Sequence, residues 1–310
     1  MFRKKEKEEA ESNSKLNRIT KSTNIIFNII FILISFICVI PVIFVFMISI
    51  TSESSLTQYG YQFIPKGFSN AAYVFLYREG KTILRAFGIS AFVTIVGTML
   101  AIVLTTTMGY VLSRKTYKLN GFLTWIVFIP MIFNGGMLSS YVINTNLLGL
   151  KDSIWALILP LAVSSFNVII CKTFFRTTIP DSIVESAKID GATQLRIFSK
   201  IVIPISKPVI ATIGLFSCFA YWNDWFQSSL YISNNKLYSL QALLNNIQKN
   251  IEYLANNPAA GVTLQQYKNM MPQEGVRMAI AIVIIVPIAC AYPFFQKYFI
   301  SGLTIGAVKG

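Results

Sequence analysis

The sequence is organised around residues 180–204, which read Pro180-Asp-Ser-Ile-Val-Glu-Ser-Ala-Lys-Ile-Asp-Gly-Ala-Thr-Gln-Leu-Arg-Ile-Phe-Ser-Lys-Ile-Val-Ile-Pro204. Pro180 followed by Asp181 is typical of a helix start, because proline fixes the backbone angle and a carboxylate favours the positive helix end. Apolar residues then recur at spacings of three and four, which predicts amphipathic helix: Ile183, Val184, Ala187, Ala192, Leu195, Phe198 and Val202. Asp190-Gly191 interrupts the pattern, and a glycine lets the chain turn there. We therefore predict two short helices joined by a turn, apolar on one side and charged on the other.

The composition indicates a membrane protein rather than a soluble globule. Of the 310 residues, 54% are hydrophobic and only 13% are charged. A helix needs about 20 apolar residues to cross the bilayer core. We therefore predict an all-α membrane protein with six transmembrane helices, at about Ile25–Ile50, Ile83–Leu112, Phe122–Val142, Ile154–Phe175, Ile201–Phe226 and Met278–Phe295. The first run is too long for a signal peptide, so we expect it to remain as an uncleaved anchor.

The placement of lysine and arginine predicts which loops face the cytoplasm. The formal net charge is +14, and no nucleic-acid-binding motif accompanies it, so we interpret the charge as positive-inside bias and attraction to anionic lipid. Basic residues concentrate in the N-terminal tail and at about 114–118, 172–207 and 297–309, and they are sparser at 51–81, 144–152 and 230–275. This alternation is consistent if both termini are cytoplasmic. Residues 1–24 are predicted to be a disordered cytoplasmic tail.

Histidine and cysteine usage excludes most metal sites and histidine-dependent catalysis. The chain has no histidine and four cysteines, at positions 38, 171, 218 and 290. Each cysteine lies in or beside an apolar run, so we predict small packing residues rather than disulfide partners.

The residue order in the 180–204 segment carries more information than its periodicity. Periodicity alone is equally consistent with an ordinary loop lying on the lipid headgroups. However, Glu185-Ser186-Ala187, then Asp190-Gly191-Ala192, Phe198 and Pro204, resembles the cytoplasmic coupling motif of ABC importer permeases, with Ser186 where that family usually has alanine. The full pattern is most similar to the carbohydrate-uptake branch related to the maltose importer.

This resemblance implies that the 180–204 segment docks into a cleft on a separate ATPase subunit. The chain lacks the Gly-x-x-x-x-Gly-Lys-Ser/Thr order of a nucleotide-binding loop, so ATP and magnesium are expected on that partner, with no catalytic residue, cofactor or metal here. The other implied partners are a second permease, a second ATPase and an extracellular substrate-binding lipoprotein. The residues implied in coupling are Glu185, Ser186, Ala187, Asp190, Gly191, Ala192, Phe198 and Pro204.

Two further elements are candidates for the translocation path. Tyr221-Trp222-Asn223-Asp224-Trp225 closes the fifth run, either as an interfacial aromatic belt or as residues that face a wet cavity. The Trp222-Asn223-Asp224 order also resembles this permease family. The break Asn134-Gly135-Gly136 in the third run is either a plain kink or a cavity-lining interruption.

The last outer loop and the C-terminal tail complete the prediction. The outer loop, at about 230–275, contains a helical pattern over Leu240–Tyr253, and in maltose-type relatives the corresponding loop reaches the binding protein. The chain ends in Gly306-Ala307-Val308-Lys309-Gly310, which resembles the end of this permease branch and implies a tail, 301–310, that enters the ATPase interface; the alternative is a disordered stub.

The predicted protein is thus the permease subunit, with its membrane domain at 25–300, of an ABC importer for an oligosaccharide or other carbohydrate in a bacterial plasma membrane. An importer for a peptide or phosphonate is the alternative within transport. A membrane-embedded transferase and a non-transporting sensor or scaffold are the alternatives outside it.

Overall fold

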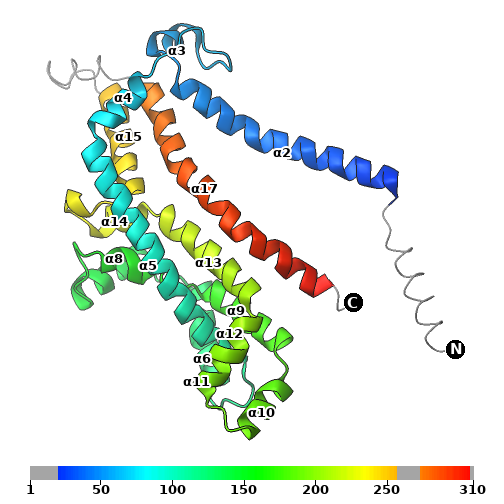
Figure 1. Cartoon of the computed structure of the whole chain (residues 1–310). Helices are drawn as coiled ribbons and strands as arrows, with labels where there is room; N and C mark the ends of the chain where they lie inside the picture. Colours follow the sequence, from blue (N-terminus) through cyan, green and yellow to red (C-terminus); the bar gives the residue numbers. More distant parts are fainter. Residues whose placement is uncertain (1–19, 257–272, 308–310) are drawn as a thin grey trace.

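The computed structural model describes residues 20–256 and 273–307, and within these ranges the regular structure is helical apart from one isolated bridge between Thr51 and Phe68. Long helices run beside one another between two ends of the molecule (Figure 1). The short helices α3 (Glu53–Tyr59) and α4 (Ala71–Arg78) lie at one end, and α10 (Asp181–Ile189) and α11 (Gln194–Ile197) lie at the other. We call these the α4 end and the α10 end.

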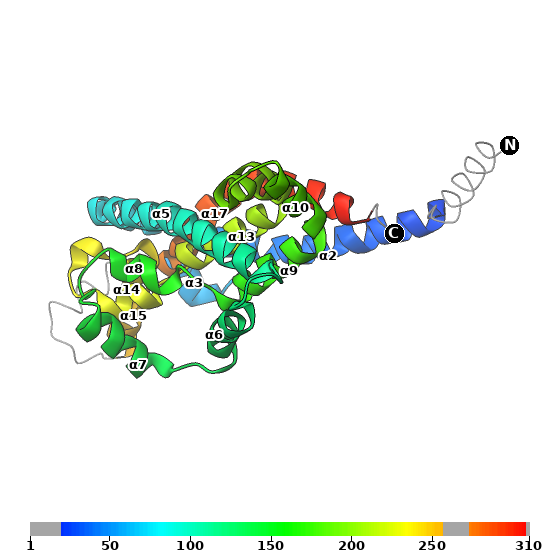
Figure 2. The same ribbon diagram turned by 90° about the horizontal axis from the view of Figure 1, so that it is seen from below.

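Three long helices are apolar enough to cross a membrane, and each matches a predicted run. They are α2 (Lys21–Ser49), α5 (Gly80–Ser113) and α17 (Gln273–Ala307), the last qualifying over Gln273–Cys290. Figures 1 and 2 show α2 leaning away from the other helices toward its N-terminal end. Its side chains are almost all exposed as far as Phe46, which suits contact with lipid rather than with this chain's own core.

Two predicted spans are bent rather than straight. In the first, α8 (Trp155–Ile158) and the 3-10 turn η2 (Leu159–Leu161) meet α9 (Ser165–Thr178) at 48°. In the second, α11, the π-helix η3 (Phe198–Val202) and α12 (Ile203–Ile205) meet α13 (Lys207–Trp222) at 83°. Pro208 lies in the first turn of α13 and lacks the N–H that would continue a preceding helix, which accounts for the second bend.

The third predicted span is interrupted where the glycines predicted a break. It forms α6 (Asn120–Ile132), then a break before α7 (Gly136–Val142) and a π-helical turn η1 (Ile143–Leu147). Gly136 has φ +82°, a conformation that glycine adopts without strain. The 13 residues of α6 make a helix of about 20 Å, too short for a bilayer core of about 30 Å.

The connection that follows α13 is also helical. Three elements follow α13: α14 (Phe226–Tyr231), the 3-10 turn η4 (Asn235–Leu237) and α15 (Leu240–Asn256). The helix α15 confirms the predicted helical pattern. Residues 257–272 of the loop that is predicted to reach the binding protein lie outside the described residues.

Small side chains on one stripe of α5 allow two other helices to pack closely against it. Gly97, Ala101, Thr105 and Gly109 are buried at four-residue spacing. A Cβ atom at Gly97 would lie 2.4 Å from Cζ of Tyr221 in α13, and one at Gly109 would lie 2.8 Å from Cβ of Cys171 in α9. Close approach at small residues is a common way for membrane helices to associate, because lipid offers no hydrophobic driving force between them.

The prediction for the cysteines holds only in part. Cys171 is buried between helices as expected for a packing residue, but Cys38 and Cys290 are exposed on α2 and α17. Those two positions face outward because much of α2, and part of α17 near Cys290, is not covered by the rest of the chain.

At the α4 end, α3 is fastened to the start of α17. The Glu53 carboxylate accepts hydrogen bonds from the backbone N–H groups of Glu274 (3.2 Å) and Gly275 (3.4 Å). Tyr61 Oη donates to Glu274 Oε2 at 2.7 Å, and this bond is the main cause that raises the pKa of Tyr61. Carboxylates at a helix N-terminus satisfy N–H groups that have no partner within the helix.

Asp152 provides a similar connection and a pH-dependent prediction. Its Oδ1 accepts from the backbone N–H groups of Ser233 (2.6 Å) and Asn234 (2.9 Å), and these bonds lower the pKa of Asp152. A lowered folded pKa stabilises the fold above the ordinary carboxyl value, and the stabilisation is lost as pH falls through the folded value. We expect the melting temperature of the wild type to fall more between pH 6 and pH 3 than that of Asp152→Asn.

Asparagine is a suitable replacement for Asp152 because it keeps the accepting oxygen. Asp152 has φ 55°, and asparagine also tolerates this conformation. Thermal unfolding of the detergent-purified protein across that pH range measures the difference. Parallel curves for the two proteins would contradict the assigned role.

Candidate functional site

The 180–204 segment forms the two helices that its apolar spacing predicts. The turn between them begins at Asp190, which ends α10, and Gly191 has φ +77°. The N–H of Ala192 donates to the Ala187 carbonyl (2.9 Å), and the N–H of Gly191 donates to the Lys188 carbonyl (3.0 Å). This pair of bonds is a Schellman motif, which ends a helix at a left-handed residue. It explains why glycine occurs at position 191, the residue with positive φ.

The apolar side of the segment packs against the ends of the long helices. Val184, Ile197 and Val202 are buried, and Ala187, Ala192 and Phe198 are partly buried against them. The same cluster includes residues of α5, α9 and α13 and the residue that follows α9: Tyr110, Cys171, Phe175, Ile179, Val209 and Ile213. The segment is therefore seated on three helices at once, and its position depends on theirs.

The opposite side exposes two large apolar residues. Ile189 is 87% exposed and Leu195 is 76% exposed. We predicted Leu195 on the apolar side, and the structure corrects this: Ile197 takes the buried position in α11, and two residues apart on a helix point to nearly opposite sides. Sequence periodicity also missed Ile189, which lies outside the three-and-four spacing that follows Val184.

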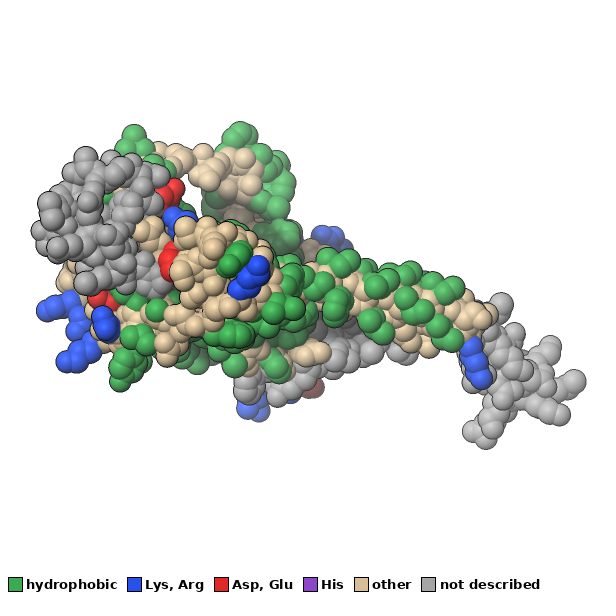
Figure 3. Space-filling view, turned by 90° about the horizontal axis from the view of Figure 1, so that it is seen from above, with side chains coloured by type: hydrophobic (Ala, Val, Ile, Leu, Met, Phe, Trp, Pro, Cys, Tyr) green, Lys and Arg blue, Asp and Glu red, His purple; other side chains and the backbone are tan. Residues whose placement is uncertain are grey.

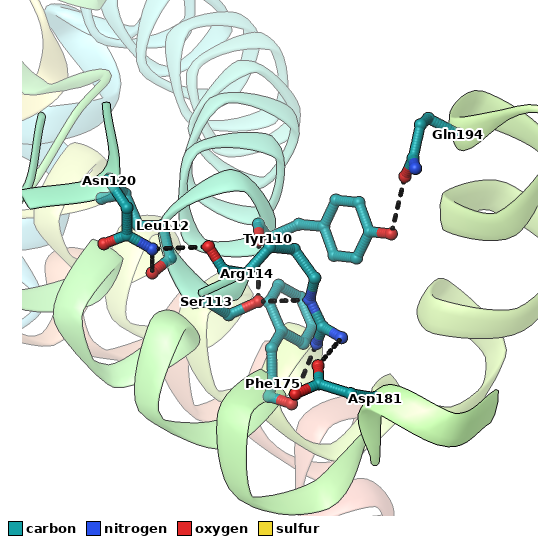
Figure 4. Close-up of polar contacts among 8 residues, drawn as sticks. All are labelled: Tyr110, Leu112, Ser113, Arg114, Asn120, Phe175, Asp181 and Gln194. Carbon is teal, nitrogen blue, oxygen red and sulfur yellow. Dashed lines mark hydrogen bonds and ion pairs between the residues drawn. The ribbon is translucent and has the colours of Figure 1, made fainter. Parts of the chain in front are cut away.

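Arg114, the residue after α5, joins α5, α9 and α10 (Figure 4). Its Nη1 forms an ion pair with Asp181 Oδ1 at 3.1 Å, its Nη2 donates to the Phe175 carbonyl at 3.4 Å, and its Nε donates to Ser113 Oγ at 3.1 Å. The guanidinium carbon lies 5.2 Å from the centre of the Tyr110 ring. The Arg114 side chain is 10% exposed. From the sequence, Arg114 counts only toward the positive-inside pattern. Asp181, the acidic residue at the start of α10, is the signal that could have indicated its partner.

A second polar contact and a cavity lie beside this arginine. Tyr110 Oη donates to Gln194 Oε1 at 3.3 Å, so α5 also contacts the start of α11 (Figure 4). A cavity of about 380 Å³ separates the end of α5 from α10, with Tyr117, Glu185 and Lys188 in its lining. Side-chain packing between α5 and α10 is consequently incomplete, and the ion pair bridges one edge of the gap.

The residues predicted for the translocation path do not converge in this chain. Trp222 is 7% exposed, and its Nε1 donates to the Ile284 carbonyl in α17 at 3.3 Å. Asn223 is exposed, and its amide bonds the Phe219 carbonyl of its own helix. Asp224 accepts from the Gln227 N–H at the start of α14. Trp225 is 45% exposed, with Lys249 Nζ 5.5 Å from its ring centre.

The remaining candidates are Asn134 and the C-terminal tail. Asn134 is exposed and its Oδ1 accepts from the Gly136 N–H at 2.9 Å; Figure 2 shows α7, which follows it, apart from α10. Gly306 and Ala307 end α17, so the backbone of the predicted tail is helical up to that point. Val308 and Lys309 lie outside the described residues.

Comparison with solved structures defines the class of protein. The fold matches a chain of a bacterial ABC transporter involved in the import of the acidic polysaccharide alginate, with a TM-score of 0.75 and 27% identity. The match covers 91% of this chain and 99% of that one. The fold is therefore that of a membrane-spanning subunit of an ABC importer. No protein-family model matches the chain.

Curated relatives narrow the class further. The chain is 37% identical over 279 residues to the polygalacturonan/rhamnogalacturonan transport system permease protein YtcP of Bacillus subtilis, covering 90% of this chain and 95% of YtcP. It is also 37% identical over 298 residues to the protein LplC of the same organism, covering 96% and 97% respectively. The chain belongs to the permease family of bacterial carbohydrate-uptake ABC importers, and it is an integral protein of the cell membrane.

Proposed function

We propose that this chain is one of two homologous permease subunits that import an oligosaccharide or related carbohydrate, coupled to ATP hydrolysis through the 180–204 segment. Two partner ATPase subunits bind ATP and magnesium, and an extracellular lipoprotein delivers the substrate; this chain itself is not catalytic. The observation that carries the proposal is the exposure of Ile189 and Leu195 beside Glu185 and Asp190 on the α10 end. Exposed apolar side chains with a polar surround are typical of a protein interaction site.

Six crossings with both termini in the cytoplasm fit this role. Three are α2, α5 and α17, two are the bent pairs that end in α9 and α13, and the sixth is the interrupted α6 with α7. The basic residues Arg114, Lys115 and Lys118 follow the end of α5 nearest α10, which supports a cytoplasmic α10 end by the positive-inside rule. Hydrophobic side chains cover much of the projecting α2 (Figure 3), as lipid contact requires.

A carbohydrate is favoured over a peptide or phosphonate as the substrate. YtcP is named for polygalacturonan and rhamnogalacturonan transport, and the matching solved structure is described as a transporter involved in alginate import. Within this proposal, Trp225 is the path candidate with the most suitable surroundings, since an exposed ring beside the Lys249 ammonium offers an apolar face and a charge. Trp222 acts as a packing residue. The tail at Gly306–Lys309 is proposed to enter the ATPase interface.

Substitution of Ile189 by aspartate tests the docking surface. Ile189→Asp adds a charge to a side chain that is 87% exposed, so we expect normal folding but at least about a tenfold loss of co-purifying ATPase subunits, as for loss of a central apolar anchor. The matched control is Ile64→Asp, since Ile64 is 80% exposed and lies beyond α3 at the α4 end. Equal retention of the ATPases by both variants would refute the docking role.

A further inference from the structure

We propose that Arg114 is a positioning residue that fastens α10 to α5 and α9, so that movement of α10 is transmitted to these helices. This inference rests on the proposed coupling role of the 180–204 segment. It assigns a function to a residue outside that segment, at the end of the second predicted span.

The contacts of Arg114 link three elements through one rigid group. The guanidinium reaches Asp181, the first residue of α10, and the Phe175 carbonyl near the end of α9, while its Nε bonds Ser113 at the end of α5. Guanidinium is planar and presents several donors in fixed directions, so it holds partners in a defined geometry that a lysine ammonium does not. The three helices are therefore joined at one point.

The Arg114–Asp181 ion pair differs from an ordinary surface ion pair because Arg114 is mostly buried. Its side chain is 10% exposed, whereas that of Asp181 is 61% exposed. Removal of Asp181 leaves a mostly buried cation without its carboxylate, and an unpaired buried charge is strongly unfavourable. Separation of Arg114 from Asp181 is therefore unfavourable, and we expect the ion pair to stay formed while α10 moves.

The adjacent cavity leaves room for α10 to move relative to α5 once the Arg114 link is broken. About 380 Å³ lies between the end of α5 and α10, beside Val184, Glu185 and Lys188. A close-packed interface would transmit movement by contact along its whole length. Here the gap leaves room for displacement. Besides the apolar packing of Val184, the link is made by two polar contacts, that of Arg114 at the start of α10 and that of Tyr110 with Gln194 at the start of α11.

Distance measurements between spin labels test this link directly. One label is placed at Ser182→Cys in α10 and the other at Leu84→Cys, which is exposed near the α4 end of α5. The assembled complex of permeases and ATPases is used, with the four natural cysteines replaced. In the complex that carries only the two labels and the cysteine replacements, we expect the distance distribution to stay the same when AMP-PNP is added, because α10 and α5 move together.

Breaking the pair should weaken the attachment of α10 to α5 enough for α10 to move separately. In Arg114→Gln and in Asp181→Asn we expect AMP-PNP to shift the distance distribution. In the double variant we expect no larger shift, because both substitutions remove the same ion pair. Arg114→Lys should give an intermediate shift. Lys115→Gln, which removes the neighbouring exposed charge, should behave as the unaltered complex.

The outcomes separate this inference from the proposed function. Unchanged distributions in Asp181→Asn, with the ATPases retained, would overturn the role of Arg114 even if Ile189→Asp still released the ATPases. Retention of the ATPases by Ile189→Asp would instead contradict the docking surface. If Arg114→Gln fails to assemble, Asp181→Asn decides the matter, because the buried arginine keeps its contacts with Ser113 and Phe175 there.

Discussion

Gly191→Val is expected to lower retention of the ATPase subunits and ATP-driven uptake by roughly tenfold or more, because a left-handed conformation costs an L-residue about 1–2 kcal/mol, and more when it is β-branched. Gly191 has φ +77°, and an added Cβ would meet no atom within 4 Å. The effect therefore comes from backbone strain and not from a clash. Relief of that strain would break the two turn bonds that end α10 and change the angle between α10 and α11.

Gly191→Asn is the matched control for this prediction. Asparagine adopts the left-handed conformation more readily than other non-glycine residues, and the space around Gly191 accommodates its side chain. We expect this variant to retain most of the ATPase. If asparagine and valine were equally harmful, the conformation of the turn would not be the cause; if both were harmless, the turn would not matter for docking.

Gly97→Ala is expected to lower the free energy of unfolding by about 1–3 kcal/mol, the sum of overpacking and a weakened hydrogen bond less the gain in helix propensity. The added Cβ would lie 2.4 to 2.7 Å from three atoms of the Tyr221 ring. That ring is buried, and its Oη donates to the Ile158 carbonyl at 2.7 Å. The ring therefore has to give up this bond, or α13 has to move away from α5.

Gly88→Ala on the same helix provides the comparison. A Cβ there meets nothing within 4 Å, and alanine favours helix over glycine by up to about 1 kcal/mol, so this variant should be neutral or slightly more stable. Unfolding of the detergent-purified variants in a chemical denaturant measures both. Tyr221→Ala should remove most of the penalty of Gly97→Ala; an additive double variant would show that the two residues do not interact.

The turn and the broken third span illustrate what a local pattern predicts well. Gly191 and Gly136 both occur where the apolar periodicity is interrupted, and both have positive φ. Because few residues other than glycine adopt that conformation, a glycine at such an interruption is a good predictor of a turn or break. Leu195 shows the limit of the same reasoning. Its spacing is consistent with burial, but α11 begins at Gln194, and the start of a helix after a turn resets which residues face the core.

The amino-acid sequence by itself determined that this chain is a helical membrane protein with a turn-linked pair of helices between its fourth and fifth apolar runs. Long apolar runs, proline and glycine act over a few residues, so their effect is visible without the fold. Only the tertiary structure decided that Trp222 is buried against α17, that Ile189 faces outward and that Arg114 meets Asp181. Those outcomes depend on which helices approach one another, and residues 114 and 181 become neighbours only after α5, α9 and α10 have packed together.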